Sequence, residues 1–506
     1  MAPTNEAAQA KIEELQQQIE HLQQQAQGST TSSFDVYSTS LTSRYCSKEL
    51  TFLFSQRSRH STWRKLWLGL AEAELELGVT SITPEALKQM REALTVTDKD
   101  FEAAKVEEKI RRHDVMAHVH AFGLVAPAAA GIIHLGATSC FVTDNAELIL
   151  MRDALDILIN KMAKVISNLQ AFSLQWKSEP TLAYTHLQSA QPITVGRRSA
   201  QWVQDLVMDL EALEAVRKGL RFRGAQGTTG TQASFLEIFE GDHEKCLALN
   251  EKLCQRFGFP SCYDISTQTY TRKVDTIVAN AVAGIGASAS KIAGDLRHLA
   301  SWKEIDEPSE KSQIGSSAMA YKKNPMRCER VSSLSRVLMS KTVTFNQTHA
   351  THACRRIDIP EMFLLAEAIL IGLDNVSAGL VVYPGSIRAH YMSELPFMLT
   401  EAIIMKLVAK GASRQEAHEH IRVLSQEAAK VVKVEGKPND LIERIRNSEY
   451  FKPIWGELDE MMKPELYIGR SVQIVDKYCG ATGPVEKALA PYQEYISGSA
   501  TAELNV

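Results

Sequence analysis

The feature that most constrains the fold is a long stretch without helix-breaking residues. Neither Gly nor Pro occurs between Gly136 and Pro180, and apolar residues recur there at spacings of three and four. This spacing places side chains on one side of an α-helix. We therefore predict one very long helix, whose buried face is formed by Leu148, Met151, Leu155, Leu158, Met162, Ile166 and Leu169.

Further helical runs follow. Residues 197–218 and 326–359 contain neither Gly nor Pro, and the stretch after Ser266 has a helical pattern despite three glycines. Several long helices must bury their apolar stripes against one another, which predicts an all-α fold with a helical bundle. Stripes of this length exceed what one chain covers, so we expect oligomerisation through the bundle.

The chain is long enough for several domains. With 506 residues, it divides by pattern into an N-terminal coiled-coil-like extension and linker (1–33), a helical domain (34–138), a central long-helix bundle domain (139–384) and a C-terminal helical domain (385–506). In the extension, Ile12, Leu15, Ile19 and Leu22 form a heptad seam before a linker that starts at Gly28. The pattern allows a flexible appendage or a dimerising coil.

Composition narrows the choice of partners. A net charge of -4 gives no reason to expect nucleic acid. The N-terminus is polar and Gln-rich, and no apolar stretch reaches the length of a membrane span, so we expect a cytoplasmic protein without a membrane partner. The eight cysteines form no CxxC pair, and His113, His118 and His120 lack a completing ligand, so we predict no metal site.

The segment 312–330, SQIGSSAMAYKKNPMRCER, combines flexible, nucleophilic and cationic residues. It is typical of a mobile catalytic loop, although an ordinary solvated loop with a basic rim has the same composition. A helix starting at Met326 would direct free backbone N–H groups at a nearby anion.

Within this segment, GSSAMAYKKNP resembles the signature loop of the fumarase/aspartase superfamily. Other stretches resemble the adenylosuccinate lyase family within it: SRYCSKEL, RRHDVMAHVHAFG, HLGATSCFVTDN, YTHLQSAQP, GTTGTQASF and TQTYTRKVD, which together run from Ser43 into the C-terminal region. The resemblance implies a three-domain all-α fold and a homotetramer with active sites shared between subunits.

The implied reactions release fumarate from adenylosuccinate, giving AMP, and from SAICAR, the succinylated aminoimidazole carboxamide ribotide, giving AICAR. They need no cofactor. By resemblance Ser316 is the general base and His186 the general acid, which Glu329 orients, while Lys322 and Asn324 bind the carboxylate where charge accumulates. Without the motif, His186 would be interpreted as a structural histidine and Glu329 as a helix-surface charge.

The resemblance also implies a set of substrate contacts. They are Arg44, Tyr45, Arg112, His113, Asp114, Thr138, Ser139, Gln268, Arg330 and Arg356.

Two departures from the family pattern affect these expectations. Ala320 stands where the signature loop has Pro, which frees the loop. Residues 346–356 are about nine residues, or roughly two and a half helical turns, shorter than the family's stretch and lack its substrate-binding Arg and Ser. We expect the loss to fall at a helix connection, with Asp358 as N-cap and Pro360 in the first turn of a helix at Glu361.

Three hypotheses follow from the sequence. The first is an active adenylosuccinate lyase. The second is a catalytically impaired member of the fold, or an incomplete gene model that lacks a substrate-binding segment. The third is another fumarate-releasing lyase of the superfamily.

Overall fold

The structure is a computed structural model that describes residues 35–310, 313, 317–350, 355–502 and 504. The chain forms two compact units, residues 1–45 and 46–506. In the first unit the described residues include one π-helical turn, η1 (Leu41–Tyr45). The predicted heptad seam lies outside the described residues.

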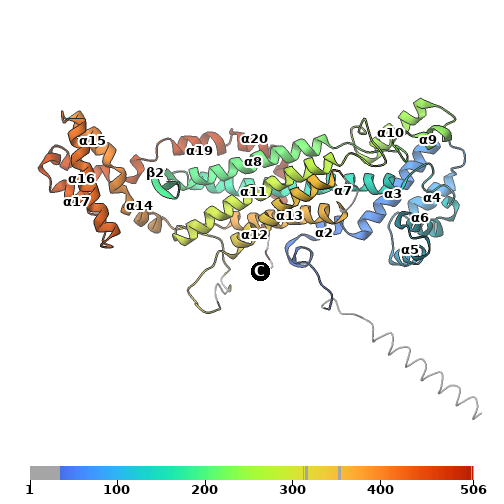
Figure 1. The fold of residues 1–506 in the computed structure, drawn as a ribbon, viewed down its shortest axis with the longest axis horizontal. Helices are drawn as coiled ribbons and strands as arrows, with labels where there is room; N and C mark the ends of the chain where they lie inside the picture. Colours follow the sequence, from blue (N-terminus) through green and yellow to red (C-terminus); the bar gives the residue numbers. More distant parts are fainter. Residues whose placement is uncertain (1–34, 311–312, 314–316, 351–354, 503, 505–506) are drawn as a thin grey trace, which may run out of the picture. The chain divides into compact units, whose positions relative to one another are not determined.

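The second unit is built mainly from α-helices (Figure 1). Its N-terminal elements are α2 (Lys48–Leu53), α3 (Gln56–Glu76), α4 (Pro84–Glu92), α5 (Asp98–Arg111), α6 (Asp114–Val125) and η2 (Pro127–Ala129). The central elements are α7 (Ser139–Gln175), β1 (Pro180–Thr185), β2 (Gln188–Thr194), α8 (Val195–Gly219), α9 (Ala233–Ile238), α10 (His243–Phe257), α11 (Lys273–Ser301), β3 (Ile305–Asp306), α12 (Met326–Thr348) and α13 (Arg355–Ala378).

The remaining elements follow β4 (Val381–Val382), which pairs antiparallel with β3. They are α14 (Pro384–Met398), α15 (Thr400–Ala409), α16 (Arg414–Lys433), α17 (Leu441–Arg446), η3 (Glu449–Glu457), α18 (Leu458–Met461), η4 (Pro464–Leu466), α19 (Ser471–Cys479), α20 (Pro484–Leu489), η5 (Ala490–Tyr492) and α21 (Gln493–Gly498). Helices α14 to α17 surround a core of their own, whereas α19 to α21 pack back along α7 and α8.

The predicted long helix is confirmed as α7, with 37 residues. At 1.5 Å per residue it is about 55 Å long. All seven residues predicted for its core face are buried. The helix begins where Gly136 and Thr138 end the preceding loop and stops five residues before Pro180, in keeping with the Gly/Pro-free stretch.

Helices α7, α8, α11, α12 and α13 lie side by side as the central bundle (Figure 1). Glycine allows two of the close approaches. A Cβ on Gly196 would lie 2.2 Å from the Ser173 carbonyl oxygen, where the first turn of α8 packs against the last turns of α7. A Cβ on Gly286 would lie 3.2 Å from the Ser335 carbonyl oxygen, where α11 crosses α12. The three glycines of the α11 sequence therefore do not interrupt the helix, and one of them serves its packing.

The run 326–359 is two helices rather than one. Helix α12 ends at Thr348 and α13 begins at Arg355, so the shortened stretch does fall at a connection. The predicted start of the second helix is wrong, because Asp358 and Pro360 lie inside α13. Asp358 does not cap the helix. Its Oδ1 accepts a hydrogen bond from Lys341 Nζ at 3.1 Å, and the same ammonium donates to Glu361, which holds this turn of α13 on α12.

Helix α11 is long and apolar enough to cross a membrane by length and composition, which the sequence interpretation had excluded for every stretch of the chain. Half of its most apolar window is buried inside the molecule. It packs against α8, α12 and α13, so it has the environment of a core helix of the bundle.

Candidate functional site

The first group of predicted site residues meets where α5, α6 and α7 come together. Arg112 ends α5 with φ of 56°, and His113 is the N-cap of α6. The His113 Nδ1 atom accepts from the Met116 N–H at 3.4 Å, and its Nε2 lies within hydrogen-bond distance of Ser139 Oγ, at 3.3 Å. Gln268 Nε2 lies 3.5 Å from Thr138 Oγ1.

Asp114 joins Arg356 to this group. Its Oδ2 accepts from Arg356 Nη1 at 3.0 Å, and its Oδ1 accepts from the Val115 N–H at 2.8 Å. Burial raises the pKa of the Asp114 carboxyl. The Arg356 guanidinium and the Val115 N–H together lower this pKa by more than burial raises it, so the carboxyl has a pKa below its usual value. Arg356 is therefore anchored beside the start of α7 although it lies far away in the sequence.

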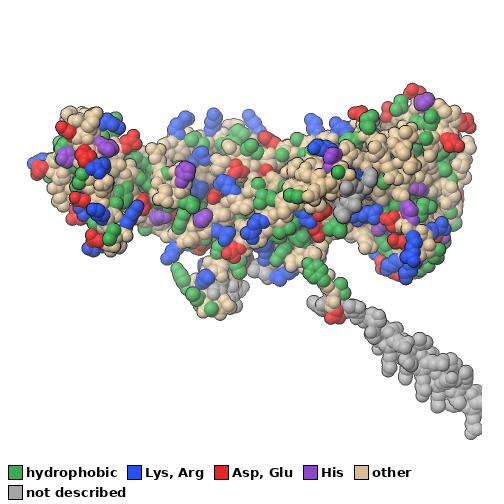
Figure 2. Space-filling view, viewed as in Figure 1, with side chains coloured by type: hydrophobic (Ala, Val, Ile, Leu, Met, Phe, Trp, Pro, Cys, Tyr) green, Lys and Arg blue, Asp and Glu red, His purple; other side chains and the backbone are tan. Residues whose placement is uncertain are grey.

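This first group is suited to bind an anion. Thr138 is the N-cap residue of α7, and its side chain makes no capping hydrogen bond to that helix start. Lys and Arg side chains gather over the neighbouring α5, whose last turn holds Lys109 and Arg111 (Figure 2). Helix-terminal N–H groups and cations together provide the usual means of binding a phosphate or carboxylate.

His186 stands at the tip of the β1–β2 hairpin. His186 and Leu187 are the two turn residues, with φ of 53° and 58°, the geometry of a type I′ turn. Asn and Gly usually occupy such positions, because other residues are strained there. Both side chains are exposed. A strained turn that displays an exposed histidine is the kind of feature that persists at functional sites.

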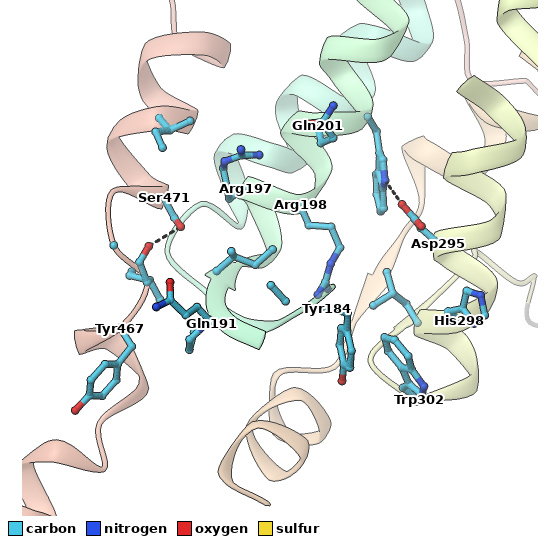
Figure 3. Close-up of a pocket in the computed structure, with 18 of the residues that line it drawn as sticks. Tyr184, Gln191, Arg197, Arg198, Gln201, Asp295, His298, Trp302, Tyr467 and Ser471 are labelled. Atoms are coloured by element: carbon cyan, nitrogen blue, oxygen red, sulfur yellow. Dashed lines mark hydrogen bonds between the residues drawn. The ribbon is translucent and has the colours of Figure 1, made fainter. Parts of the chain in front are cut away.

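Behind the hairpin lies a cavity of about 760 Å³ (Figure 3). His186 contributes to its lining, together with cations and aromatic rings from four segments of the chain. These include Tyr184, Arg197, Arg198, Lys291, Trp302, Tyr467 and Arg470. The cavity therefore lies between the hairpin, α8, the end of α11 and the segment before α19.

The third group lies at the start of α12. Lys322 and Asn324 precede the helix, and Glu329 and Arg330 lie in its first turns. Lys322 and Glu329 are exposed, while Asn324 and Arg330 are partly buried. Ser316, the predicted base, lies outside the described residues.

The sequence interpretation of the α12 start is wrong in one respect, because its N–H groups are not free for a ligand. Glu307 Oε1 accepts from the Arg327 N–H at 3.0 Å, and Oε2 accepts from the Cys328 N–H at 2.9 Å. Burial raises the pKa of Glu307, and these two N–H groups offset that rise only in part. The chain's own carboxylate thus occupies this helix terminus.

The structure does not bring the three groups together within one chain. The first group sits at the N-terminal end of α7, while β1 starts just beyond its C-terminal end, so His186 lies about one helix length away, roughly 55 Å. Among the described residues no hydrogen bond joins His186 to Glu329. Arg44 and Tyr45 belong to the first compact unit. Within that unit the Arg44 side chain is exposed and the Tyr45 side chain is partly buried.

The structure adds residues that the sequence interpretation missed. Glu307 is one, and the pair formed by the buried Glu304 and the partly buried His390, near the hairpin, is another. No sequence signal identifies them, because each is a single polar residue whose partners lie far along the chain.

Comparison with known proteins is consistent with this architecture. The family model described as "Lyase" matches residues 28–339, and the model "Adenylosuccinate lyase C-terminus" matches residues 396–478. The adenylosuccinate lyase of Saccharomyces cerevisiae is 52% identical over 482 residues, covering 94% of this chain and 99% of that protein. That of Schizosaccharomyces pombe is 50% identical over 470 residues, covering 91% and 97%.

Among solved structures, the 3-carboxy-cis,cis-muconate lactonizing enzyme from Pseudomonas putida superposes with a TM-score of 0.74. The sequence identity is 20%, and the match covers 90% of this chain and 99% of that one. This likeness concerns the fold alone.

Proposed function

Because this chain belongs to the adenylosuccinate lyase family and is a carbon–nitrogen lyase, we propose that it performs two fumarate-releasing reactions of purine nucleotide biosynthesis. It eliminates fumarate from adenylosuccinate, giving AMP, and from SAICAR, giving AICAR. The sequence is 52% and 50% identical to two adenylosuccinate lyases over nearly their full length, which supports this function.

The elimination divides between a base and an acid. Ser316 removes the carbon-bound proton beside the succinyl carboxylate, and His186 protonates the nitrogen that leaves. Lys322 and Asn324 bind the carboxylate on which negative charge develops. Glu329 orients the imidazole of His186 by accepting from its second ring nitrogen. The strained turn and exposure of His186 support its role, because both suit a group presented to another surface.

Recognition of the substrate's anionic groups falls to the first group, with Arg44, Tyr45 and Arg330. Arg112 and Arg356 supply positive charge there, and the start of α7 adds oriented N–H dipoles. The hydrogen bond of Asp114 with Arg356 supports this assignment, because it fixes the guanidinium in one orientation before substrate binds.

The distance between the first group and His186 leads to a proposal about how subunits assemble. A reaction site is a few ångströms wide, whereas about 55 Å of helix separates Thr138 from the hairpin. We propose a homotetramer in which bundles pack together, so that each active site takes its residues from different subunits. Exposed apolar residues on the bundle helices, Met208, Ile277, Val337 and Val343, support such packing.

The shortened connection does not favour an inactive protein. It lies between two intact helices, and the Lys341 bridge fixes the start of α13 on α12. The absent family Arg and Ser bear on affinity rather than on the acid or the base. We place the active enzyme in the cytoplasm, where purine nucleotides are made.

Steady-state release of fumarate from adenylosuccinate and from SAICAR, measured on the purified full-length chain, tests this function. Turnover of both substrates is expected. If a correctly assembled protein turns over neither substrate, the hypothesis of a catalytically impaired member of the fold is favoured. If it releases fumarate from a different succinyl adduct instead, it is another lyase of the superfamily.

A further inference from the structure

Glu304 is a buried carboxylate for which the proposed reaction has no use. Its side chain is 1% exposed and lies between the end of α11 and β3. Its Oε1 lies 2.7 Å from His390 Nδ1, and its Oε2 lies 3.9 Å from Arg198 Nη1. The Glu304 carboxylate raises the pKa of His390, against the effect of burial. A buried carboxylate thus faces the His390 imidazole from α14 and the Arg198 guanidinium from α8.

Both side chains also hold strand β1. Arg198 donates from Nη2 to the Leu182 carbonyl oxygen. His390 Nε2 lies 3.3 Å from the Tyr184 hydroxyl, and the Tyr184 ring stacks on Trp302 with centroids 4.5 Å apart. Figure 3 shows Tyr184 beside Trp302 and Arg198 extending towards the same strand. Two points of β1, both within four residues of His186, therefore connect to Glu304.

The hairpin needs such anchors. Its register shifts between Leu182, which pairs with Pro192, and Tyr184, which pairs with Ser189. An irregularity of this kind bends a strand and re-aims the side chains beyond it. An isolated two-stranded hairpin is marginally stable in water, so side-chain contacts must fix the direction of its tip. The two anchors stand on either side of the irregularity.

We propose that Glu304, acting through His390 and Arg198, is a positioning residue that fixes the direction in which His186 is presented. The inference rests on the proposed role of His186 as general acid. A misplacement of about 1 Å at a reacting group can cost on the order of a hundredfold in rate. Loss of the Glu304 charge removes the group that holds both Arg198 and His390, and it frees the strand that these two side chains contact.

The test compares kcat and KM for Glu304→Gln, His390→Gln and His390→Arg. Glu304→Gln and His390→Gln should each lower kcat by about tenfold or more and leave KM within about twofold, because the acid acts mainly in the transition state. His390→Arg places a permanent cation beside Glu304 and should retain more of kcat than His390→Gln. Asp306→Asn is the matched control. Asp306 is a carboxylate two residues after Glu304, but it accepts from the Tyr383 hydroxyl at 2.9 Å rather than from a group that holds the hairpin.

A double-mutant cycle with His186→Asn separates positioning from a general structural effect. In the His186→Asn background, Glu304→Gln should produce no further loss of kcat, because the residue that it positions is gone. Additive losses would overturn the inference, as would unchanged kcat in Glu304→Gln and His390→Gln. If Glu304→Gln fails to fold, the two His390 variants decide by the same criteria.

The cycle also distinguishes this inference from the proposed function. Wild-type kcat in His186→Asn would refute the role of His186 itself. A large loss in His186→Asn together with wild-type kcat in Glu304→Gln and His390→Gln would refute only the positioning role.

Discussion

Arg112 and His186 provide a direct test of shared active sites, because they lie at opposite ends of α7. The helix is 37 residues long, about 55 Å, and neither residue can reach the other within one chain. Arg112→Ala alone should lower kcat/KM roughly ten- to more than hundredfold, the usual cost of one charge-assisted contact of about 1.5–3 kcal/mol. His186→Ala alone should lower kcat.

Mixing the two variants should restore activity. If each site takes Arg112 from one subunit and His186 from another, random assembly of equal amounts gives each position a one-half chance of being native, so about one quarter of the sites contain both native residues. The mixture, unfolded and refolded together, should therefore reach about one quarter of the wild-type rate of fumarate release at substrate concentrations below KM.

A same-end pair is the matched control. Arg112 and Arg356 belong to the same group of one chain, since Arg356 binds Asp114, two residues after Arg112, so a mixture of Arg112→Ala and Arg356→Ala leaves no such group intact. It should recover almost nothing. No recovery in the opposite-end mixture, despite normal assembly, would refute shared sites, and equal recovery in both mixtures would refute the grouping of residues.

Three further perturbations have defined outcomes. Ser316→Ala should remove most turnover but leave the melting temperature and assembly unchanged, and near-normal turnover would exclude Ser316 as the base. Burial raises the pKa of Glu74 to about 8, and neither carboxylate oxygen has a partner among the described residues, so the wild type should lose stability as pH rises from about 4.5 to 8. Glu74→Gln should therefore gain about 3 kcal/mol over wild type in urea unfolding at pH 7 and little at pH 4, whereas equal stability at both pH values would contradict an unpaired carboxyl. Restoring the family stretch between His349 and Arg355 should lower KM roughly ten- to more than hundredfold, and an unchanged KM would mean that Arg356 or a neighbouring subunit already makes the contact.

The helices were the most predictable part of the fold. Helix α7 follows from the absence of Gly and Pro and from the apolar repeat, because local sequence decides both where a helix can continue and which face it buries. The start of α13 was not predictable in the same way. Asp358 and Pro360 have the sequence pattern of a helix start, but Lys341 on the facing helix binds Asp358 and Glu361, and the helix extends back to Arg355.

The candidate site was predictable only as a set of residues. The signature loop and the other motifs identified His186, Lys322 and Glu329 by resemblance, but a motif does not state whether its members meet within one chain. The contacts of Glu304 could not be predicted from the sequence, because Arg198, Glu304 and His390 lie far apart along the chain.

The location of the helix terminus that could bind an anion is also a tertiary property. At α12 the Glu307 carboxylate already accepts from the Arg327 and Cys328 N–H groups, and a second anion there would face its negative charge. Negative charge that develops near the signature loop must then be stabilised by side chains rather than by this helix terminus, and Lys322 is the cation predicted to do so. At α7 the N-cap Thr138 makes no side-chain capping bond, and Arg112 precedes His113, whose ring lies 3.3 Å from Ser139 Oγ in the first turn. We therefore expect the substrate's fixed anionic groups at the start of α7 and the developing charge at Lys322.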